Sequence, residues 1–493
     1  MFRVKHLFFG SYAIIAFMVF AACNRDISGD MLANLAPETS LVTDTIIRFG
    51  DDRLESEVSL NWWSDDKDGF VVGYEFTFDA AITTTTVWQF TELSDSIFIL
   101  APPAGEDSAD FVFQIRAIDN LGLEDPTPSR LVIPVKNSPP TVAFLPGLLN
   151  PVKSFPALKY YWNGSDPDGA DNLLRYEICI NDTTQTPYQM DKTASSAIFE
   201  AIDPGVEAMI CKIYQNANTL PNAETLAGLV GNTWNTIFIR AVDQSEAKSN
   251  FVAADSVFVK QVSSTVLMVN GYSTTTNEAF YAEKLINSGI SVFDTIQIFE
   301  SIAGNYTQQS ADNITQTKIF DMFDLIIWFS NQADNTFSLA QKTTGSFFNT
   351  GGKMLMSVYI SSTFDPLSNF LDFTPIASLV SPEGTTLILN LDAQLLPEAP
   401  DWPILQSSTI VGTVKPINLQ IGATPLYMAD LTAKDNITLS LTPWTGVSTV
   451  MAKKYDATGN PNFIIATLEL NKLDGLGTVD ELFQKVLIDE FGF

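Results

Sequence analysis

Hydrophobic and polar residues alternate in short runs through the first half of the chain. Residues 58–79 read VSLNWWSDDKDGFVVGYEFTFD, which is two alternating stretches separated by an acidic, glycine-containing turn. Alternation with a period of two places one face of a strand in a core and the other in solvent. With turn residues about every ten positions, the pattern predicts antiparallel β-sandwiches.

This segment recurs one hundred residues further along the chain. Residues 159–178 read KYYWNGSDPDGADNLLRYEI, so Trp62 matches Trp162 and the turn and the following Tyr-Glu pair match as well. Each copy closes with a similar strand, FQIRAIDN at 113–120 and FIRAVDQ at 238–244. The proline-containing stretch VKNSPPTVAFLPG separates the copies and is typical of a linker. We therefore predict one sandwich over 40–137 and a second over 138–263, the second with an insertion around 187–232.

The shared motifs resemble fibronectin type III-like domains, an immunoglobulin-like class, of bacterial surface proteins. The motifs are a strand tryptophan, an Asp-x-Asp-Gly turn, Tyr-Glu and Arg-Ala-x-Asp, and the resemblance covers about residues 40–262. It implies spacer, adhesive or ligand-presenting roles. Most of these positions are core and turn residues, so they are informative about fold rather than about a ligand.

The pattern of hydrophobic and polar residues changes from Thr265 onward. TVLMVNGY is a continuous apolar run, NEAFYAEKLINSG places apolar residues on one helical face, and VFDTIQIF and FDLIIWFS are apolar runs again. Strands buried on both faces that alternate with helices predict an α/β domain with a mainly parallel sheet over 264–493.

DLIIWFS followed by FFNTGGKMLMSV resembles the class I glutamine-amidotransferase-like fold, a flavodoxin-like sheet. That family places a cysteine in a Gly-x-Cys-x-Gly turn after the last of these strands. Here the turn reads Ser357-Val-Tyr359-Ile-Ser361, and no histidine follows. The resemblance therefore implies the fold without the catalytic residues, a pseudoenzyme.

The N-terminus has the pattern of a secretion signal. Arg3 and Lys5 precede an uncharged run that ends in Ala21-Ala22-Cys23. The last three residues resemble the lipobox of bacterial lipoproteins, in which the cysteine is acylated. We predict a signal peptide over 1–22, lipidation of Cys23, a linker over 23–39, and an exported protein anchored in the bacterial outer membrane. The alternative is ordinary cleavage after Ala22, which leaves a free thiol.

Charge and composition narrow the classes of function. The chain has 57 acidic and 27 basic residues, a net charge of -30, and this disfavours nucleic acid as a partner. Its one histidine, His6, lies in the predicted signal, which excludes Ser-His-Asp and Cys-His catalysis and histidine-ligated metals in the mature protein. Cys179 and Cys211 could pair or remain reduced, and the sequence favours neither.

Two features are candidate binding sites. Asp66, Asp68 and Glu75 have the spacing of a calcium loop, although a structural turn explains Asp and Gly there more simply. Otherwise no cofactor is predicted. Trp63 follows the core-facing Trp62 on the same strand, so it is expected to face outward, where it could stack on a sugar.

We predict a non-catalytic binding, adhesion or scaffold lipoprotein whose partners are the membrane, through its lipid anchor, and a protein or glycan ligand that the sequence does not identify. Two alternatives remain. One is a carboxylate-dependent hydrolase or transferase in the C-terminal domain, and the other is a glycan-binding component of an uptake system.

Overall fold

The structure is a computed structural model that describes residues 33–43, 46, 48, 53–145, 152–272, 274, 277–298, 312–364 and 371–493. The predicted signal peptide and Cys23 lie outside these residues. The chain divides into two compact units, Met1–Asn137 and Ser138–Phe493. The predicted boundary between the two sandwiches coincides with this division, whereas the predicted boundary at 263/264 lies inside the second unit.

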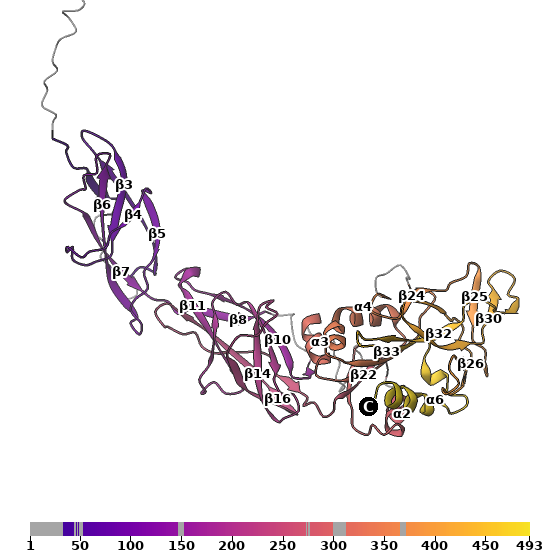
Figure 1. Cartoon of the computed structure of the whole chain (residues 1–493). Coiled ribbons are helices and arrows are strands. Elements are labelled where there is room, and N and C mark those ends of the chain that lie inside the picture. Colours follow the sequence, from indigo (N-terminus) through magenta and orange to yellow (C-terminus); the bar gives the residue numbers. More distant parts are fainter. Residues whose placement is uncertain are drawn as a thin grey trace, which may run out of the picture. The chain divides into compact units, whose positions relative to one another are not determined.

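The first unit is an antiparallel β-sandwich (Figure 1). One sheet has the strand order β1-β2-β5 and the other β4-β3-β6-β7. A three-stranded sheet that packs against a four-stranded sheet, with these strand orders, is the arrangement of fibronectin type III-like domains. The strands are β1 Glu38–Leu41, β2 Glu57–Asp65, β3 Val71–Thr77, β4 Gln89–Thr91, β5 Asp95–Ile99, β6 Ser108–Asp119 and β7 Ser129–Lys136.

Alternation along β2 builds the core of this sandwich. Trp62 is 2% exposed, as predicted, and its ring meets Tyr74 edge-on at 6.1 Å and Phe113 at 5.8 Å. The Trp62 indole nitrogen donates a hydrogen bond of 2.9 Å to the Leu93 carbonyl oxygen, so its one polar group is satisfied in the core.

The second unit begins with another antiparallel sandwich. A five-stranded sheet, β15-β14-β13-β10-β8, faces a four-stranded sheet, β12-β11-β17-β18, and a smaller sheet has the order β16-β19-β9. Trp162 is 1% exposed and meets Tyr176 edge-on at 5.8 Å, which repeats the Trp62–Tyr74 contact. The strands are β8 Thr141–Phe144, β9 Lys153–Ser154, β10 Ala157–Ser165, β11 Leu173–Ile180, β12 Tyr188–Asp191, β13 Ser196–Ala201, β14 Ala208–Gln215, β15 Thr225–Val230, β16 Thr233–Asn235, β17 Ile237–Asp243, β18 Val252–Ala253 and β19 Val257–Val259.

The C-terminal part of the second unit contains a nine-stranded sheet in the order β21-β20-β22-β23-β33-β32-β29-β26-β27. Pairing is parallel from β21 to β33 and antiparallel from β33 to β27, so the sheet is mixed where the sequence predicted a mainly parallel one. Its strands are β20 Val266–Gly271, β21 Asp294–Gln297, β22 Leu325–Ser330, β23 Lys353–Val358, β26 Gln394–Pro397, β27 Leu405–Gln406, β29 Thr424–Ala429, β32 Thr449–Tyr455 and β33 Pro461–Ala466.

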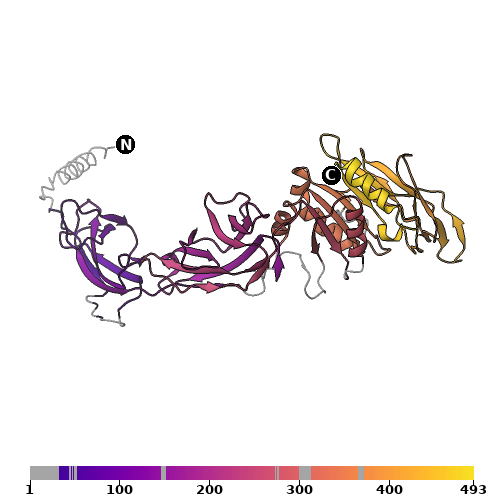
Figure 2. The ribbon, with the colours of Figure 1, turned by 90° about the horizontal axis from the view of Figure 1, so that it is seen from below.

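Helices cover both faces of this sheet. Residues of α2 and α6 share one core cluster with Val266 and Met268, and residues of α3, α4 and α5 share the other with Leu267 and Val269. Figure 2 shows the C-terminal helix in yellow against the strands. The helices are α2 Glu278–Asn287, α3 Asn313–Phe320, α4 Ala333–Thr343, α5 Gly345–Asn349 and α6 Val479–Gln484. None of the helices in the described ranges is long and apolar enough to cross a membrane.

Two further small sheets complete this part of the unit. They have the orders β24-β28 and β25-β30-β31. Their strands are β24 Ile376–Leu379, β28 Ile417–Leu419, β25 Thr385–Ile388, β30 Thr432–Asp435 and β31 Leu441–Pro443.

The second sandwich and the C-terminal part share a core. Phe155, just before β10, and Ala157, the first residue of β10, belong to the same hydrophobic cluster as the sheet residues Leu267 and Val269. The Phe155 ring meets the Phe323 ring edge-on at 5.4 Å. This shared core explains why residues 138–493 form one compact unit.

The Tyr-Glu and Arg-Ala-x-Asp motifs form the same ion pair in both sandwiches. Glu75 on β3 binds Arg116 on β6 at 2.6 Å, and Glu177 on β11 binds Arg240 on β17 at 2.6 Å. An aromatic ring lies over each guanidinium at 4.3 Å, from Trp88 and Phe251 respectively. The two motifs recur together because the glutamate of one pairs across the strands with the arginine of the other.

The second copy of this ion pair is the more deeply buried. The Glu177 side chain is 3% exposed and is also bound by Arg175 at 3.1 Å and Lys248 at 3.5 Å. The Glu75 side chain is 21% exposed. Burial opposes the ionisation of Glu177, but hydrogen bonds from Arg240 and Arg175 outweigh burial and lower its pKa.

We predict that Glu177→Gln lowers the free energy of unfolding of the second unit by about 2 kcal/mol, because it weakens the charge-assisted hydrogen bonds that the buried carboxylate accepts from Arg240 and Arg175. Glu75→Gln, the matched change in the first unit, should cost less than half as much. Urea unfolding measures the free energy of unfolding of both variants. Since the folded-state pKa of Glu177 is depressed, its contribution is full above the unfolded-state value of about 4.3 and is lost as the pH falls through the folded-state pKa. Equal losses for the two variants would contradict this ranking.

Candidate functional site

The residues of the predicted calcium loop have partners within the first unit. Glu75 lies on β3 and is bound by Arg116, because a cross-strand arginine stands opposite it. Asp68 accepts a hydrogen bond of 3.1 Å from the Leu35 amide and Asp66 accepts a long one of 3.4 Å from the Asp68 amide. In the described part of the chain, no group of three or more His, Cys, Asp or Glu side chains is arranged to hold a metal ion.

Trp63 is 55% exposed, whereas its neighbour Trp62 is 2% exposed. Successive residues of a strand point to opposite faces, so this difference follows from the geometry of β2. The outward orientation is as predicted, and a sugar-binding role for Trp63 stays a prediction.

Cys179 and Cys211 are both buried free thiols. They lie on different sheets of the second sandwich, on β11 and β14. Burial raises the pKa of Cys211 to about 12, so this thiol is not a nucleophile at neutral pH.

The carboxyl end of β23 is where the resemblance to amidotransferases places a nucleophile. Ser357 is buried there, and its hydroxyl is used for structure. It donates to the Leu468 carbonyl oxygen at 3.1 Å, accepts from the Leu470 amide at 3.0 Å and lies 2.9 Å from the Tyr281 hydroxyl. The segment around η4, Leu470–Lys472, is thereby attached to this edge of the sheet.

Two carboxylates lie near the same edge. Glu469 accepts a hydrogen bond of 2.8 Å from Tyr272 and is ion-paired with Lys472. Glu278 accepts hydrogen bonds from Asn270 at 3.4 Å and Gln297 at 3.2 Å. Each carboxylate is therefore engaged by its own neighbours, which is the arrangement of a structural network rather than of an acid–base pair facing a substrate.

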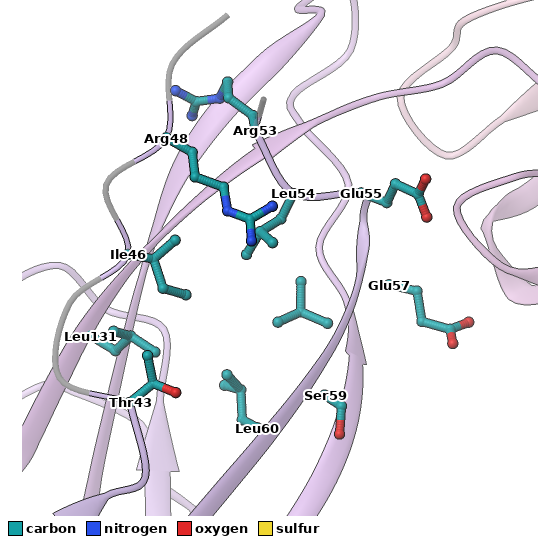
Figure 3. A pocket seen from close by; sticks show the side chains of 11 residues that line it. Thr43, Ile46, Arg48, Arg53, Leu54, Glu55, Glu57, Ser59, Leu60 and Leu131 are labelled. Atoms are coloured by element: carbon teal, nitrogen blue, oxygen red, sulfur yellow. The ribbon is translucent and has the colours of Figure 1, made fainter. Parts of the chain in front are cut away.

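A cavity of about 450 Å³ lies in the first unit beside β2 (Figure 3). The Arg48 side chain points toward Leu54, and Glu55 and Glu57 lie on the opposite side with their carboxylates turned away from Arg48 (Figure 3). Arg53 donates to the Val135 carbonyl oxygen at 3.0 Å and pairs with Asp110. Residues 44, 45, 47 and 49–52, which are neighbours in sequence of the lining residues Thr43, Ile46, Arg48 and Arg53, lie outside the described residues.

A larger cavity of about 640 Å³ lies in the second sandwich, between the loop that joins β11 to β12 and the edge strand β15. Both walls belong to described residues. It is lined by Cys179, Ile180, Asn181, Asp182, Gln185, Thr186, Pro187, Tyr188, Glu224, Thr225, Leu226, Ala227, Gly228 and Val230.

Hydrogen bonds hold the two walls of this second-sandwich cavity together. Asn181 has a left-handed backbone, with φ 63°, and its side-chain amide donates to the Gly228 carbonyl oxygen at 2.9 Å and to Asn235 at 2.7 Å. Gly228 has φ 117°, and a Cβ there would lie 2.9 Å from the Ile180 carbonyl oxygen. Glycine at 228 therefore allows β15 to approach β11, and the cavity is preformed.

The polar side chains of the cavity are two carboxylates, two amides, two threonine hydroxyls, a thiol and one phenol. Asp182 accepts from Gln185 at 2.9 Å, and this hydrogen bond is the main cause of the lowered pKa of Asp182. Tyr188 accepts from Asn222 at 2.8 Å, and burial raises its pKa. Asp182 and Glu224 are acidic and the lining contains no lysine or arginine. Such a cavity disfavours anions and suits a neutral hydroxylated or a cationic ligand.

Sequence reasoning identified an insertion around 187–232, from which much of this cavity is built, and of the lining residues it named only Cys179, as a cysteine that could pair with Cys211. The available signals were the Asn-Asp pair after an alternating strand and a glycine inside the following apolar run. Neither signal indicates that the two segments meet.

No family model matches the chain, and no curated protein matches it. Solved structures that are similar to parts of it include the fibronectin(III)-like modules of Clostridium thermocellum CbhA, with 13% identity over 45% of this chain and 95% of that chain and a TM-score of 0.18. Carbohydrate-binding modules of the β-sandwich superfamily match with 9% identity over 47% of this chain and 88% of that chain, with a TM-score of 0.16. Chitinase ChiA74 from Bacillus thuringiensis matches with 14% identity over 43% of this chain and 28% of that chain, with a TM-score of 0.14. Similarity at this level carries no argument about ligand or activity, and the fold class rests on the sheet topology described above.

Proposed function

We propose that the protein is an exported, lipid-anchored, non-catalytic binding protein and that its ligand occupies the cavity of the second sandwich. The observation that carries the proposal is the preformed cavity of about 640 Å³ between β15 and the β11–β12 loop. Its size is in the range of small-molecule sites, and its mixed apolar and hydrogen-bonding lining is typical of them.

The ligand class follows from the lining. Asp182, Glu224 and Tyr188 offer hydrogen-bond acceptors and a hydroxyl, with Leu226 and Ala227 as apolar surface. A neutral glycan fits this chemistry, since its hydroxyls donate to carboxylates and its C–H faces pack on apolar groups. The acidic rim would also accept an amine-bearing ligand, and a binding assay separates the two.

The C-terminal domain fits this non-catalytic role. Its parallel strands β20, β22 and β23 and the Gly351-Gly352 turn support the proposed relation to the glutamine-amidotransferase-like fold. Tyr359 stands where that family places its cysteine, and Ser357, two residues before it, is buried and hydrogen-bonded to Leu468 and Leu470. A buried hydroxyl without a histidine or lysine base has no means of activation, so we assign this domain a scaffold role.

The cavity assignment is tested by filling it. Ala227→Trp should reduce ligand affinity at least about ten-fold, which corresponds to about 1.4 kcal/mol, because an indole occupies the ligand volume. The soluble chain beginning at Asn24 is screened against neutral glycans and amine-bearing ligands, and affinities of the binders are measured by calorimetry. Ala253→Trp, at an exposed position of β18 outside the cavity, is the matched control and should bind normally.

Unchanged binding by Ala227→Trp would place the site elsewhere. Absence of any binder in both ligand classes would contradict the proposal.

The anchor is tested separately. Cys23→Ser should move the protein from the membrane fraction to the soluble fraction of the exporting cell without changing its fold, because acyl chains need the Cys23 thiol. Cys179→Ser, which changes a buried thiol, should leave the membrane fraction unchanged. Mass spectrometry that finds Cys23 unmodified in membrane-extracted protein would contradict the lipid anchor.

A further inference from the structure

Four exposed apolar side chains gather at one end of the first sandwich. Leu35 is 51% exposed, Phe70 65%, Leu121 71% and Leu123 41%. Leu35 precedes β1, Phe70 precedes β3, and the two other leucines lie in the loop that joins β6 to β7. The Asn120 amide donates a hydrogen bond of 2.9 Å to the Phe70 carbonyl oxygen, which brings this loop to the start of β3. These four side chains form the apolar end of the first sandwich.

The carboxylate of Asp119 holds the segments of the apolar end together. It accepts hydrogen bonds of 2.8 Å from the amides of Leu121 and Leu123. It also accepts a hydrogen bond from the side-chain amide of Asn34, the residue before Leu35. The polar groups of the turn therefore bond to one another, while the apolar side chains face solvent.

The second sandwich repeats this turn without its apolar residues. The Asp119 amide donates to the Leu123 carbonyl oxygen at 3.0 Å. In the second copy the Asp243 amide donates to the Ala247 carbonyl oxygen at 3.1 Å. Matching hydrogen bonds identify the other equivalent positions, at which Ser138 replaces Leu35, Asn172 replaces Phe70 and Ser245 replaces Leu121. Since the turn folds with small or polar residues at all four positions, the fold does not require the apolar end.

The apolar end is also where the chain arrives from the proposed anchor. Asn34 lies there, and eleven positions separate it from Cys23. A span of eleven residues reaches at most about 40 Å. A surface tethered over such a distance meets the membrane at an effective concentration of the order of millimolar, so weak contacts suffice to hold it. Ser138, the equivalent of Leu35, follows the first unit instead of an anchor.

We propose that the apolar end of the first sandwich docks on a lipid bilayer whose headgroups have no net charge. This inference rests on the proposed membrane anchor. Exposed apolar patches with polar rims mark interaction sites, and apolar side chains bury at the boundary between headgroups and acyl chains. Asp65, Asp66 and Asp68 adjoin Phe70 in sequence with Lys67 as the one cation among them, so the local negative charge disfavours anionic headgroups.

Docking is measured on the soluble chain beginning at Asn24, preceded by a histidine tag that binds nickel-chelating lipid in phosphatidylcholine vesicles. Leu121→Cys carries a fluorescent dye at the apolar end. Gln244→Cys carries the dye at an exposed position of the equivalent turn and is the matched control. Cys179 and Cys211 are buried, so the dye reacts with the introduced thiol. Lipids with spin-labelled acyl chains quench a dye that enters the bilayer.

On tethering, the dye at residue 121 should enter the boundary by about 5–10 Å, as interfacial segments do, and lose most of its fluorescence. The dye at residue 244 should keep its fluorescence. Replacing the other three apolar residues with those of the second sandwich, by Leu35→Ser, Phe70→Asn and Leu123→Ala, should restore the fluorescence at residue 121. Circular dichroism confirms that this triple variant is folded, and if it is not, Phe70→Asn alone decides.

An unquenched dye at residue 121, equal quenching at residue 244, or quenching that persists in the folded triple variant would overturn the proposal. Because the tag replaces the acyl chains, failure of docking is distinguishable from failure of the anchor, which the modification of Cys23 tests separately.

Discussion

The packing of Phe155 into the core of the C-terminal part is the interaction on which the second unit depends. Phe155 precedes β10, yet its ring lies against Phe323 in the hydrophobic cluster of the mixed sheet. Ion pairs surround this junction and satisfy the lysines that it buries, Lys159 with Asp312 and Lys260 with Asp294. The contact joins two sheets that would otherwise form separate cores.

The proposed ligand cavity depends on the same junction. Lys318 of α3 binds Glu200 of β13 at 2.7 Å and lies 3.4 Å from the ring centre of Tyr214 on β14. Strand β14 pairs with β15, and β15 is one wall of the cavity. These contacts hold the edge strand in place before a ligand binds. Binding to such a preformed site therefore costs less conformational entropy.

The fold was more predictable than the site. Local periodicity located the strand that became β22 and the core tryptophans Trp62 and Trp162, because burial on one or both faces leaves a direct pattern in the sequence. The antiparallel half of the large sheet was missed, since its strands β26 and β27 are short and their pairing depends on residues far away in sequence. The cavity was missed for the same reason: Asn181 and Gly228 meet only in the folded chain.

Calorimetric unfolding of the soluble chain tests the shared core most directly. Residues 138–493 should unfold in one cooperative transition, and Phe155→Ala should lower that transition as a whole by about 3–5 kcal/mol. Phe113→Ala, an equivalent loss in the core of the first unit, should leave it unchanged. Separate transitions for the second sandwich and the C-terminal part in the wild-type chain, or no effect of Phe155→Ala on the transition, would contradict the account of a single unit built on this contact.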